Sequence, residues 1–193
     1  MNKARLEAFS DGVFAIIITI MVLEIKVPHG EDWASLKPLI PVMLSYVLSF
    51  LFVGIYWVNH HHLLHTISKV NSAILWSNIN QLFWLSLLPV CTDWMGETHF
   101  ASRPVAVYAL LALLCGIAFT ILQFNIEKKI GDNEKLKHAF AMLKKKGMFS
   151  IAAYLIAIAF AFTNTTISGM LFLLVSIIWF IPDKNIERAL SEE

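Results

Sequence analysis

Charged residues are scarce in this sequence. Asp, Glu, Lys and Arg make up only 15% of its 193 residues, whereas 58% are hydrophobic, and the mean hydropathy is +0.67. Soluble domains carry roughly 25% charged residues, so the composition excludes an ordinary soluble domain and indicates a membrane protein. Basic charge is also limited. With a formal net charge of +1, the chain has no general positive field for phosphates, and we expect no nucleic-acid partner.

Cysteine, glycine and proline are also scarce. The two cysteines, Cys91 and Cys115, exclude a disulfide scaffold and a CxxC metal site. Eight glycines and six prolines leave no room for a long flexible linker. We therefore expect one membrane domain over residues 1–193.

What the chain has instead is long uncharged stretches. A helix needs roughly 20 mostly apolar residues to cross the hydrocarbon core. Lipid forces backbone amides to pair internally, and the alternating pattern of barrel strands is absent from these stretches, so they predict helices. The expected fold class is all-α and integral to the membrane. Six transmembrane helices are predicted at residues 9–25, 36–58, 70–90, 104–126, 147–162 and 167–182.

The last two of these helices come from a single uncharged stretch, 147–182. Its 36 residues would form a helix of about 54 Å, which is too long for one span. A tight turn at Asn164 divides it into two short helices, and Lys144 to Lys146 can lengthen one end by snorkelling. Five spans, with this stretch undivided, is the alternative.

The positions of the basic residues predict the orientation. With six spans and a cytoplasmic amino terminus, 12 of the 15 basic residues lie on the cytoplasmic side, in agreement with the positive-inside rule. Seven of the 12 are lysines in the 127–146 connector, which either is simply solvated or touches anionic lipid headgroups. We expect a multi-pass protein of the cell membrane with both termini in the cytoplasm.

The first predicted helix has one aliphatic stripe. At 100° per residue, the residues within about 60° of Ile16 include Gly12, Thr19, Ile20, Leu23 and Val27. Asp11 points about 140° away from Ile16. A carboxylate at the bilayer centre costs roughly 2.5–3.5 kcal/mol, and less near an interface. Asp11 therefore either meets water at the inner surface or binds a neighbouring helix. The candidate partners are Arg5, His60, His61, Asn78 and Asn80.

Four histidines follow the second predicted span, at His60, His61, His62 and His65. His61 and His65 are spaced i, i+4, which puts two potential metal ligands on one helix face. No third ligand follows at a convincing spacing, so we expect no metal site, no haem and no other cofactor. The histidines are interpreted as a structural, proton-sensitive group at the inner interface, because histidine titrates near neutral pH.

The segment that opens the first span resembles a known family. Arg5-Leu6-Glu7-Ala8-Phe9-Ser10-Asp11 fits the RxxxFSD signature of the bacterial members of the transmembrane protein 175 family, which are potassium channels related to the endosomal and lysosomal potassium channel of animals. Two further stretches are similar to the family's second and third spans, namely Trp57-Val58-Asn59-His60-His61 and Leu75-Trp76-Ser77-Asn78. The resemblance covers the whole chain in span count and loop order.

This resemblance implies a homotetramer in which four copies of the first helix surround a central ion path. It also implies that a hydrophobic constriction replaces the usual selectivity filter, and the chain contains no TVGYG-like loop. The constriction then falls on the aliphatic stripe, at Ile16, Thr19, Ile20 and Leu23. A polar network that holds the first helix is expected at Arg5, Ser10, Asp11, Trp57, His60 and Asn78.

Together these observations favour a passive cation channel that prefers potassium. The expected partners are potassium ions along the pore, the lipid bilayer and further copies of the chain. A proton- or cation-coupled secondary transporter is the alternative, but no predicted span has Asp, Glu, Lys or Arg near its midplane. No HExxH, GxSxG or P-loop pattern occurs, so we expect no enzyme activity.

Overall fold

The chain folds into an elongated bundle of helices. The computed structural model describes residues 2–130 and 133–180, and within these ranges it contains no strand. The elements in chain order are α1 (Lys3–Leu23), η1 (Trp33–Leu39), α2 (Ile40–His65), α3 (Ser72–Ser86), α4 (Leu88–Glu97), α5 (Ser102–Glu127), α6 (Glu134–Phe160) and α7 (Thr165–Phe180). The all-α fold class expected from the sequence is confirmed.

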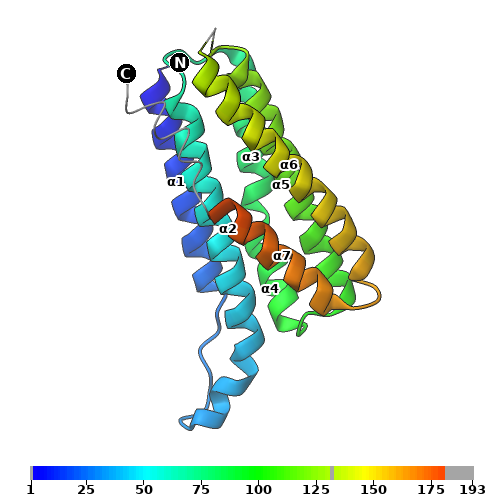
Figure 1. Ribbon diagram of the computed structural model, residues 1–193. Coiled ribbons are helices and arrows are strands. Elements are labelled where there is room, and N and C mark those ends of the chain that lie inside the picture. Colours follow the sequence, from blue (N-terminus) through cyan, green and yellow to red (C-terminus); the bar gives the residue numbers. More distant parts are fainter. Residues whose placement is uncertain (1, 131–132, 181–193) are drawn as a thin grey trace.

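Most of the helices run along the long axis of the bundle (Figure 1). α1 and α2 lie side by side at one edge, and α5 and α6 pack together at the other. α3 and α4 follow one another between these pairs, and α7 crosses the bundle obliquely against α6. The α1–α2 connection and η1 project from the bundle at the end opposite to the start of α1.

Four segments are long and apolar enough to cross a membrane. They are Lys3–Leu23, Trp33–His65, Ser72–Glu97 and Ser102–Glu127. α7 is apolar but has only 16 residues, and α6 carries lysines through its first half. The protein is therefore a multi-pass membrane protein. The last two residues of the predicted span 167–182, together with Lys184 and Arg188 of the predicted inner side, lie outside the described residues.

The second long helix extends further along the chain than the sequence suggested. α2 ends at His65, whereas residues 36–39 of the predicted span belong to η1, a 3-10 helix that contains Pro38. His60 to His65 therefore form the last turns of α2, so the helix continues beyond Val58, where the predicted span ends. The helix continues through this polar run because the His60 side chain is buried inside the bundle.

The region of the third predicted span contains two helices rather than one. α3 ends at Ser86 and α4 begins at Leu88, with Pro89 in its first turn. Proline has no amide hydrogen, and its ring clashes with the carbonyl four residues earlier, here that of Leu85. Pro89 therefore ends α3 and is well placed at the start of α4.

The 127–146 connector is mostly helical, which corrects its interpretation as a loop. α6 begins at Glu134, and the Asn133 side chain caps it by accepting a hydrogen bond from the Leu136 amide at 3.2 Å. Four apolar residues of this stretch recur with helical spacing and are buried, namely Leu136, Ala139, Phe140 and Leu143. The high lysine content of the connector concealed this amphipathic pattern.

The core of the subunit is built around α5. This helix packs against α3, α4, α6 and α7, and 61% of its most apolar 18-residue stretch is buried within the subunit. Many of its buried residues are small, and they include Ala106, Ala109, Ala112, Cys115 and Ala118. Small residues allow neighbouring helices to approach closely in a membrane.

Candidate ion path and its polar anchors

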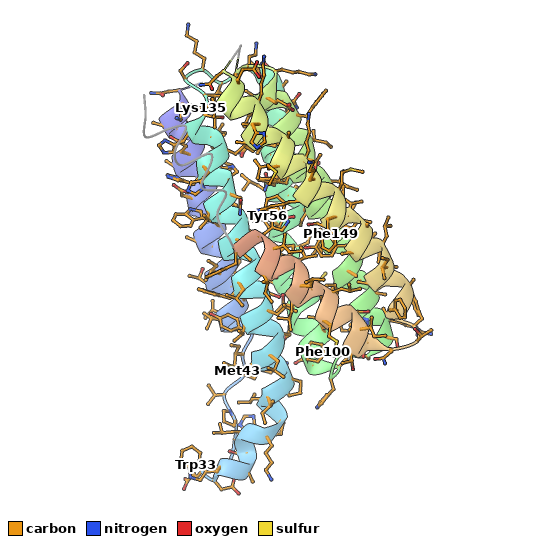
Figure 2. The ribbon with its side chains drawn as sticks, viewed as in Figure 1. Trp33, Met43, Tyr56, Phe100, Lys135 and Phe149 are labelled. Atoms are coloured by element: carbon orange, nitrogen blue, oxygen red, sulfur yellow. The ribbon has the colours of Figure 1, made fainter. Side chains whose placement is uncertain are left out.

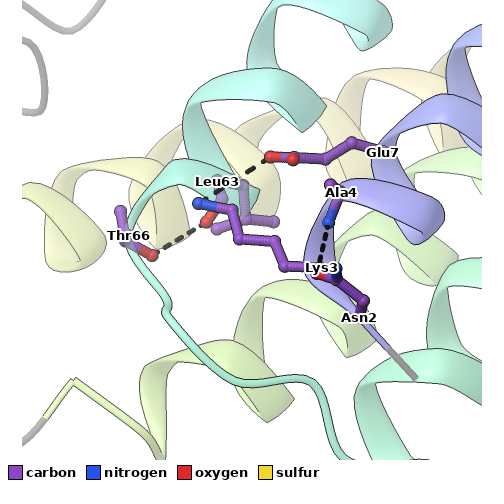
Figure 3. Close-up of polar contacts among 6 residues, drawn as sticks. All are labelled: Asn2, Lys3, Ala4, Glu7, Leu63 and Thr66. Carbon is purple, nitrogen blue, oxygen red and sulfur yellow. Dashed lines mark hydrogen bonds and ion pairs between the residues drawn. The ribbon is translucent and has the colours of Figure 1, made fainter.

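α1 starts at the same end of the bundle as the carboxyl end of α2 (Figure 3). The Asn2 side chain caps α1 by accepting a hydrogen bond from the Ala4 amide at 3.2 Å. One turn further on, the Lys3 ammonium lies 3.8 Å from a carboxylate oxygen of Glu7. The cap extends the helix six residues ahead of the predicted span, so the whole RxxxFSD segment is helical.

One face of α1 is buried in the subunit. Its members recur every three or four residues, namely Leu6, Ser10, Phe14, Ile17 and Met21. This spacing is that of a single helix face. It shows that α1 docks on the bundle along its whole length.

The predicted constriction residues lie outside this buried face. Exposure within the subunit is 57% for Ile16, 41% for Ile20 and 79% for Leu23, and Thr19 is exposed as well. The Thr19 hydroxyl donates a hydrogen bond to the Ile16 carbonyl at 2.9 Å. Its oxygen retains lone pairs that can accept from another group. The subunit therefore leaves an aliphatic stripe uncovered, with one hydroxyl oxygen beside it.

A buried chain of hydrogen bonds anchors the amino-terminal half of α1. The Asn78 side-chain amide donates to Ser10 Oγ at 3.0 Å, and Ser10 in turn donates to the Leu6 carbonyl at 2.9 Å. Asn78 Oδ1 lies 2.6 Å from His60 Nε2. Because this oxygen can only accept, Nε2 carries the hydrogen. His60, Asn78 and Ser10 are all fully or almost fully buried, so this chain ties α1, α2 and α3 together without contact with solvent.

A second anchor lies on the exposed side of α1. The Trp57 indole nitrogen donates to Asp11 Oδ1 at 2.8 Å, which gives the carboxylate its partner. Trp57 was not among the candidate partners considered for Asp11 in the sequence. The bonded residues thus form two separate branches, one buried and one exposed. Arg5 is exposed, and within the described ranges no hydrogen bond or ion pair joins it to either branch.

A second buried polar cluster, which the sequence did not reveal, joins α2, α4 and α5. Thr92 Oγ lies 2.7 Å from Ser49 Oγ, and Ser49 Oγ lies 3.0 Å from the Tyr108 hydroxyl. The three residues are buried. Isolated hydroxyl residues in apolar runs are the only sequence signal for such a cluster.

The segment just after the carboxyl end of α1 is joined to α4 by an ion pair. The Lys26 ammonium donates to a carboxylate oxygen of Glu97, and both side chains are exposed. The hydrogen bond and the negative charge of Glu97 raise the pKa of Lys26 above its usual value. Glu24, at the carboxyl end of α1, is exposed. Two carboxylates and one ammonium therefore lie near the carboxyl end of α1.

In the described part of the chain, no group of three or more His, Cys, Asp or Glu side chains is placed to hold a metal ion. The described portion likewise contains two free cysteines, Cys91 and Cys115.

Comparison with known proteins places the chain in a family. The family profile described as the endosomal/lysosomal potassium channel TMEM175 matches residues 5–89. A protein named as a potassium channel from Chryseobacterium sp. (strain P1-3) is 54% identical over 192 residues, which cover 100% of both chains. A potassium channel from Chamaesiphon minutus is 33% identical over 90% of this chain and 91% of that protein.

More distant relatives carry a different name. Human TMEM175, named as an endosomal/lysosomal proton channel, is 31% identical over 138 residues, which are 65% of this chain and 27% of the human protein. Among solved structures, the crystal structure of a lysosomal potassium-selective channel TMEM175 homolog from Chamaesiphon minutus matches with a TM-score of 0.82. It is 30% identical, and the match covers 93% of this chain and 96% of that chain.

These relatives are channels rather than enzymes, which confirms the expectation that the chain is not an enzyme. The resemblance first noticed in the RxxxFSD segment extends over the full length of the Chryseobacterium protein. The chain belongs to the TMEM175 family of channels.

Proposed function

We propose that this protein is a passive cation channel that favours potassium, formed by four subunits with α1 around a central pore. Three bacterial relatives named as potassium channels support the ion, and the first of these matches over its whole length. The similar crystal structure is also described as potassium-selective. We infer the position of the pore from the exposed aliphatic side of α1.

The observation that carries this proposal is the uncovered aliphatic stripe of α1. Lipid is as apolar as an aliphatic side chain, so exposure alone does not choose between lipid and a pore. The hydrogen bonds of Ser10 and Asp11 add a second argument, because they determine which side of α1 faces outward. Ser10 and Asp11 are hydrogen-bonded to α3 and α2, and they fix the rotation of α1 so that Ile16 and Leu23 face away from their own subunit.

The spacing along the stripe suits a gate. At a rise of 1.5 Å per residue, Ile16 and Ile20 are about 6 Å apart along the axis and Leu23 lies about 4.5 Å further. Four copies would place three apolar rings over roughly 10 Å of the pore. Such rings offer no group to replace the hydration shell of an ion, so they close the pore by dewetting and conduct when it widens.

Thr19 is the polar group nearest to these rings. Its hydroxyl hydrogen is used by the Ile16 carbonyl, its oxygen keeps lone pairs that can accept, and the residue is exposed. In a tetramer, four such oxygens would offer acceptors to a partly dehydrated cation between the apolar rings. We assign the preference for potassium to this ring of hydroxyl oxygens together with the diameter of the pore.

The polar anchors would hold α1 during gating, and the channel would lie in the cell membrane. Lys135 and the start of α1 lie at one end of the molecule, and Trp33 marks the other (Figure 2). The positive-inside rule puts the lysine-rich end in the cytoplasm. The spans are then α1, η1 with α2, α3 with α4, α5, α6 and α7, with both termini cytoplasmic.

The test is potassium flux into liposomes that contain only the purified protein. Ile20→Asn and Ile16→Asn make the apolar rings wettable and are expected to raise the basal potassium flux several-fold. Ile156→Asn is the matched control, because Ile156 on α6 has 47% exposure but lies outside the stripe. Unchanged flux in both α1 variants, with normal incorporation, would contradict the pore assignment. Flux down a potassium gradient with no second ion separates a channel from a coupled transporter.

Proton conduction is a second candidate activity. The vertebrate relatives, 31–33% identical over 65% of this chain, are named as proton channels. A pH-sensitive dye inside the same liposomes measures this activity. If protons share the pore, Ile20→Asn raises both fluxes together. If protons do not permeate, the dye signal stays at the level of protein-free liposomes.

A further inference from the structure

Three aromatic side chains line one edge of α2 where it approaches its carboxyl end. Trp57, His61 and His65 are spaced by four residues, so they lie on one helix face. The ring centroids of His61 and His65 are 4.4 Å apart, and those of Trp57 and His61 are 6.2 Å apart. All three side chains are exposed. The two imidazoles are therefore close together and are not covered by the rest of the chain.

We propose that His61 and His65 form a binding site for a divalent late first-row transition metal ion, such as Ni²⁺, Zn²⁺ or Cu²⁺. An i, i+4 histidine pair on a helix presents two imidazole nitrogens toward one point, and imidazole is a preferred ligand of these ions. Water completes the coordination sphere, because no third side chain in the described residues joins the pair. The site is thus open and exchangeable, unlike a closed structural site.

The chemistry of the pair sets which ions it selects. Mg²⁺ and Ca²⁺ prefer oxygen ligands and keep their water or carboxylate partners, so they bind poorly to two neutral imidazoles. Among late transition metals, affinity follows the order Mn²⁺ < Co²⁺ < Ni²⁺ < Cu²⁺. The tighter ions of this series are therefore the expected ligands.

The position of the pair connects it to α1. The His61 ring lies against Trp57, and the Trp57 indole donates to Asp11 of α1. A metal ion that fixes the His61 ring therefore restrains the exposed anchor of the helix assigned above to the pore. This consequence for conduction depends on the proposed function, but metal binding itself does not.

The experiment is a calorimetric titration of the full-length protein, without a polyhistidine tag, with Ni²⁺. Wild-type protein is expected to bind. His61→Ala and His65→Ala are each expected to weaken binding at least about tenfold, because even the loss of an outer-shell partner costs roughly 10–100-fold. His29→Ala is the matched control, since His29 is exposed in the α1–α2 connection. Mg²⁺ in excess should not displace Ni²⁺.

A spectroscopic measurement locates the ion. Ni²⁺ quenches nearby indoles, and Trp57 is the indole whose ring adjoins His61. The quenching seen in wild-type protein should be largely lost in Trp57→Phe and absent in the His61→Ala/His65→Ala double variant. Equal Ni²⁺ affinity in wild type and double variant, or binding without quenching, overturns the proposal. Both measurements use detergent-solubilised protein and no ion flux, so their outcome is independent of whether the protein conducts potassium.

Discussion

α1 and α5 are both apolar enough to cross a membrane, yet they differ in how much of their surface is buried within the chain. In their most apolar 18-residue stretches, 61% of α5 is buried within the subunit but only 28% of α1. α5 contributes a face of small residues that lets other helices pack closely, whereas the free side of α1 carries branched aliphatic side chains. Hydropathy therefore identifies both as membrane helices but does not show which of them forms the core.

The attachment of the two helices differs as well. α5 is held by packing along much of its length, with buried hydrogen bonds between Tyr108 and Ser49 on α2 and from the Gln123 amide to the Phe140 carbonyl on α6. α1 has less packing, and its amino-terminal half is held by two polar anchors, one buried at Ser10 and one exposed at Asp11. In lipid there is little hydrophobic drive between helices, so packing and hydrogen bonds decide how firmly a helix is held. We infer that α5 supports the subunit and that α1 is the helix free to carry function.

The most direct test of this difference between α1 and α5 is to replace one leucine by alanine in each helix. Leu122→Ala in α5 removes a side chain with 0% exposure, and the cavity it leaves should cost about 2–5 kcal/mol of unfolding free energy. Leu23→Ala in α1 removes one with 79% exposure, so unfolding should hardly change. Potassium flux should instead rise, because the outermost apolar ring widens.

Unfolding in detergent, followed by tryptophan fluorescence, measures the first effect, and liposome flux measures the second. Equal destabilisation by the two truncations would show that Leu23 is covered by protein in the subunit. It would remove the distinction between the helices.

The second prediction concerns the buried anchor of α1. Asn78→Ala leaves the His60 Nε2 hydrogen without its acceptor and the Ser10 oxygen without its donor, although Ser10 still donates to the Leu6 carbonyl. A buried polar group left unpaired costs about 1–3 kcal/mol. Tyr108→Phe is the counterpart in α5, and it should cost less, because Ser49 keeps its contact with Thr92.

Asn59→Ala is the control next to His60, since the Asn59 side chain donates only to the Ile55 carbonyl of its own helix. The same unfolding assay ranks the three variants. A loss for Asn78→Ala no greater than that for Asn59→Ala would mean that the buried chain does not anchor α1.

Sequence alone predicted the helical class and the stripe of α1, because apolar runs and a 100° repeat are local properties. The family resemblance pointed to a polar network of six residues, and hydrogen bonds connect five of them in two branches, namely Ser10, Asp11, Trp57, His60 and Asn78 but not Arg5. How they pair could not be predicted. Which side chain meets which depends on the relative rotation and height of three helices, and these are set by packing along their whole length.

The errors have physical causes too. The break at Leu87 was missed because Pro89 sits inside an uninterrupted apolar run, where hydropathy gives no boundary and only the missing amide hydrogen does. The first half of α6 was interpreted as a loop because its lysines outweigh its apolar face. The Ser49–Thr92–Tyr108 cluster was invisible because its members lie 43 and 59 residues from Ser49 in sequence.

The smallest expected effect on stability, and the most specific to α1, comes from its exposed anchor. Trp57→Phe keeps an aromatic ring but removes the donor to Asp11, and Asp11→Ala removes the acceptor. An exposed hydrogen bond contributes about 1 kcal/mol or less to unfolding, so the subunit should stay folded. The expected change is in the amount of tetramer or in potassium flux, because the rotation of α1 is then less constrained.

Trp94→Phe is the matched control, since Trp94 on α4 has the same 43% exposure as Trp57. Light scattering of the purified particles and liposome flux measure the two quantities. If both match wild type in Trp57→Phe and Asp11→Ala, the exposed anchor has no part in assembly or gating, and the buried chain through Asn78 alone orients α1.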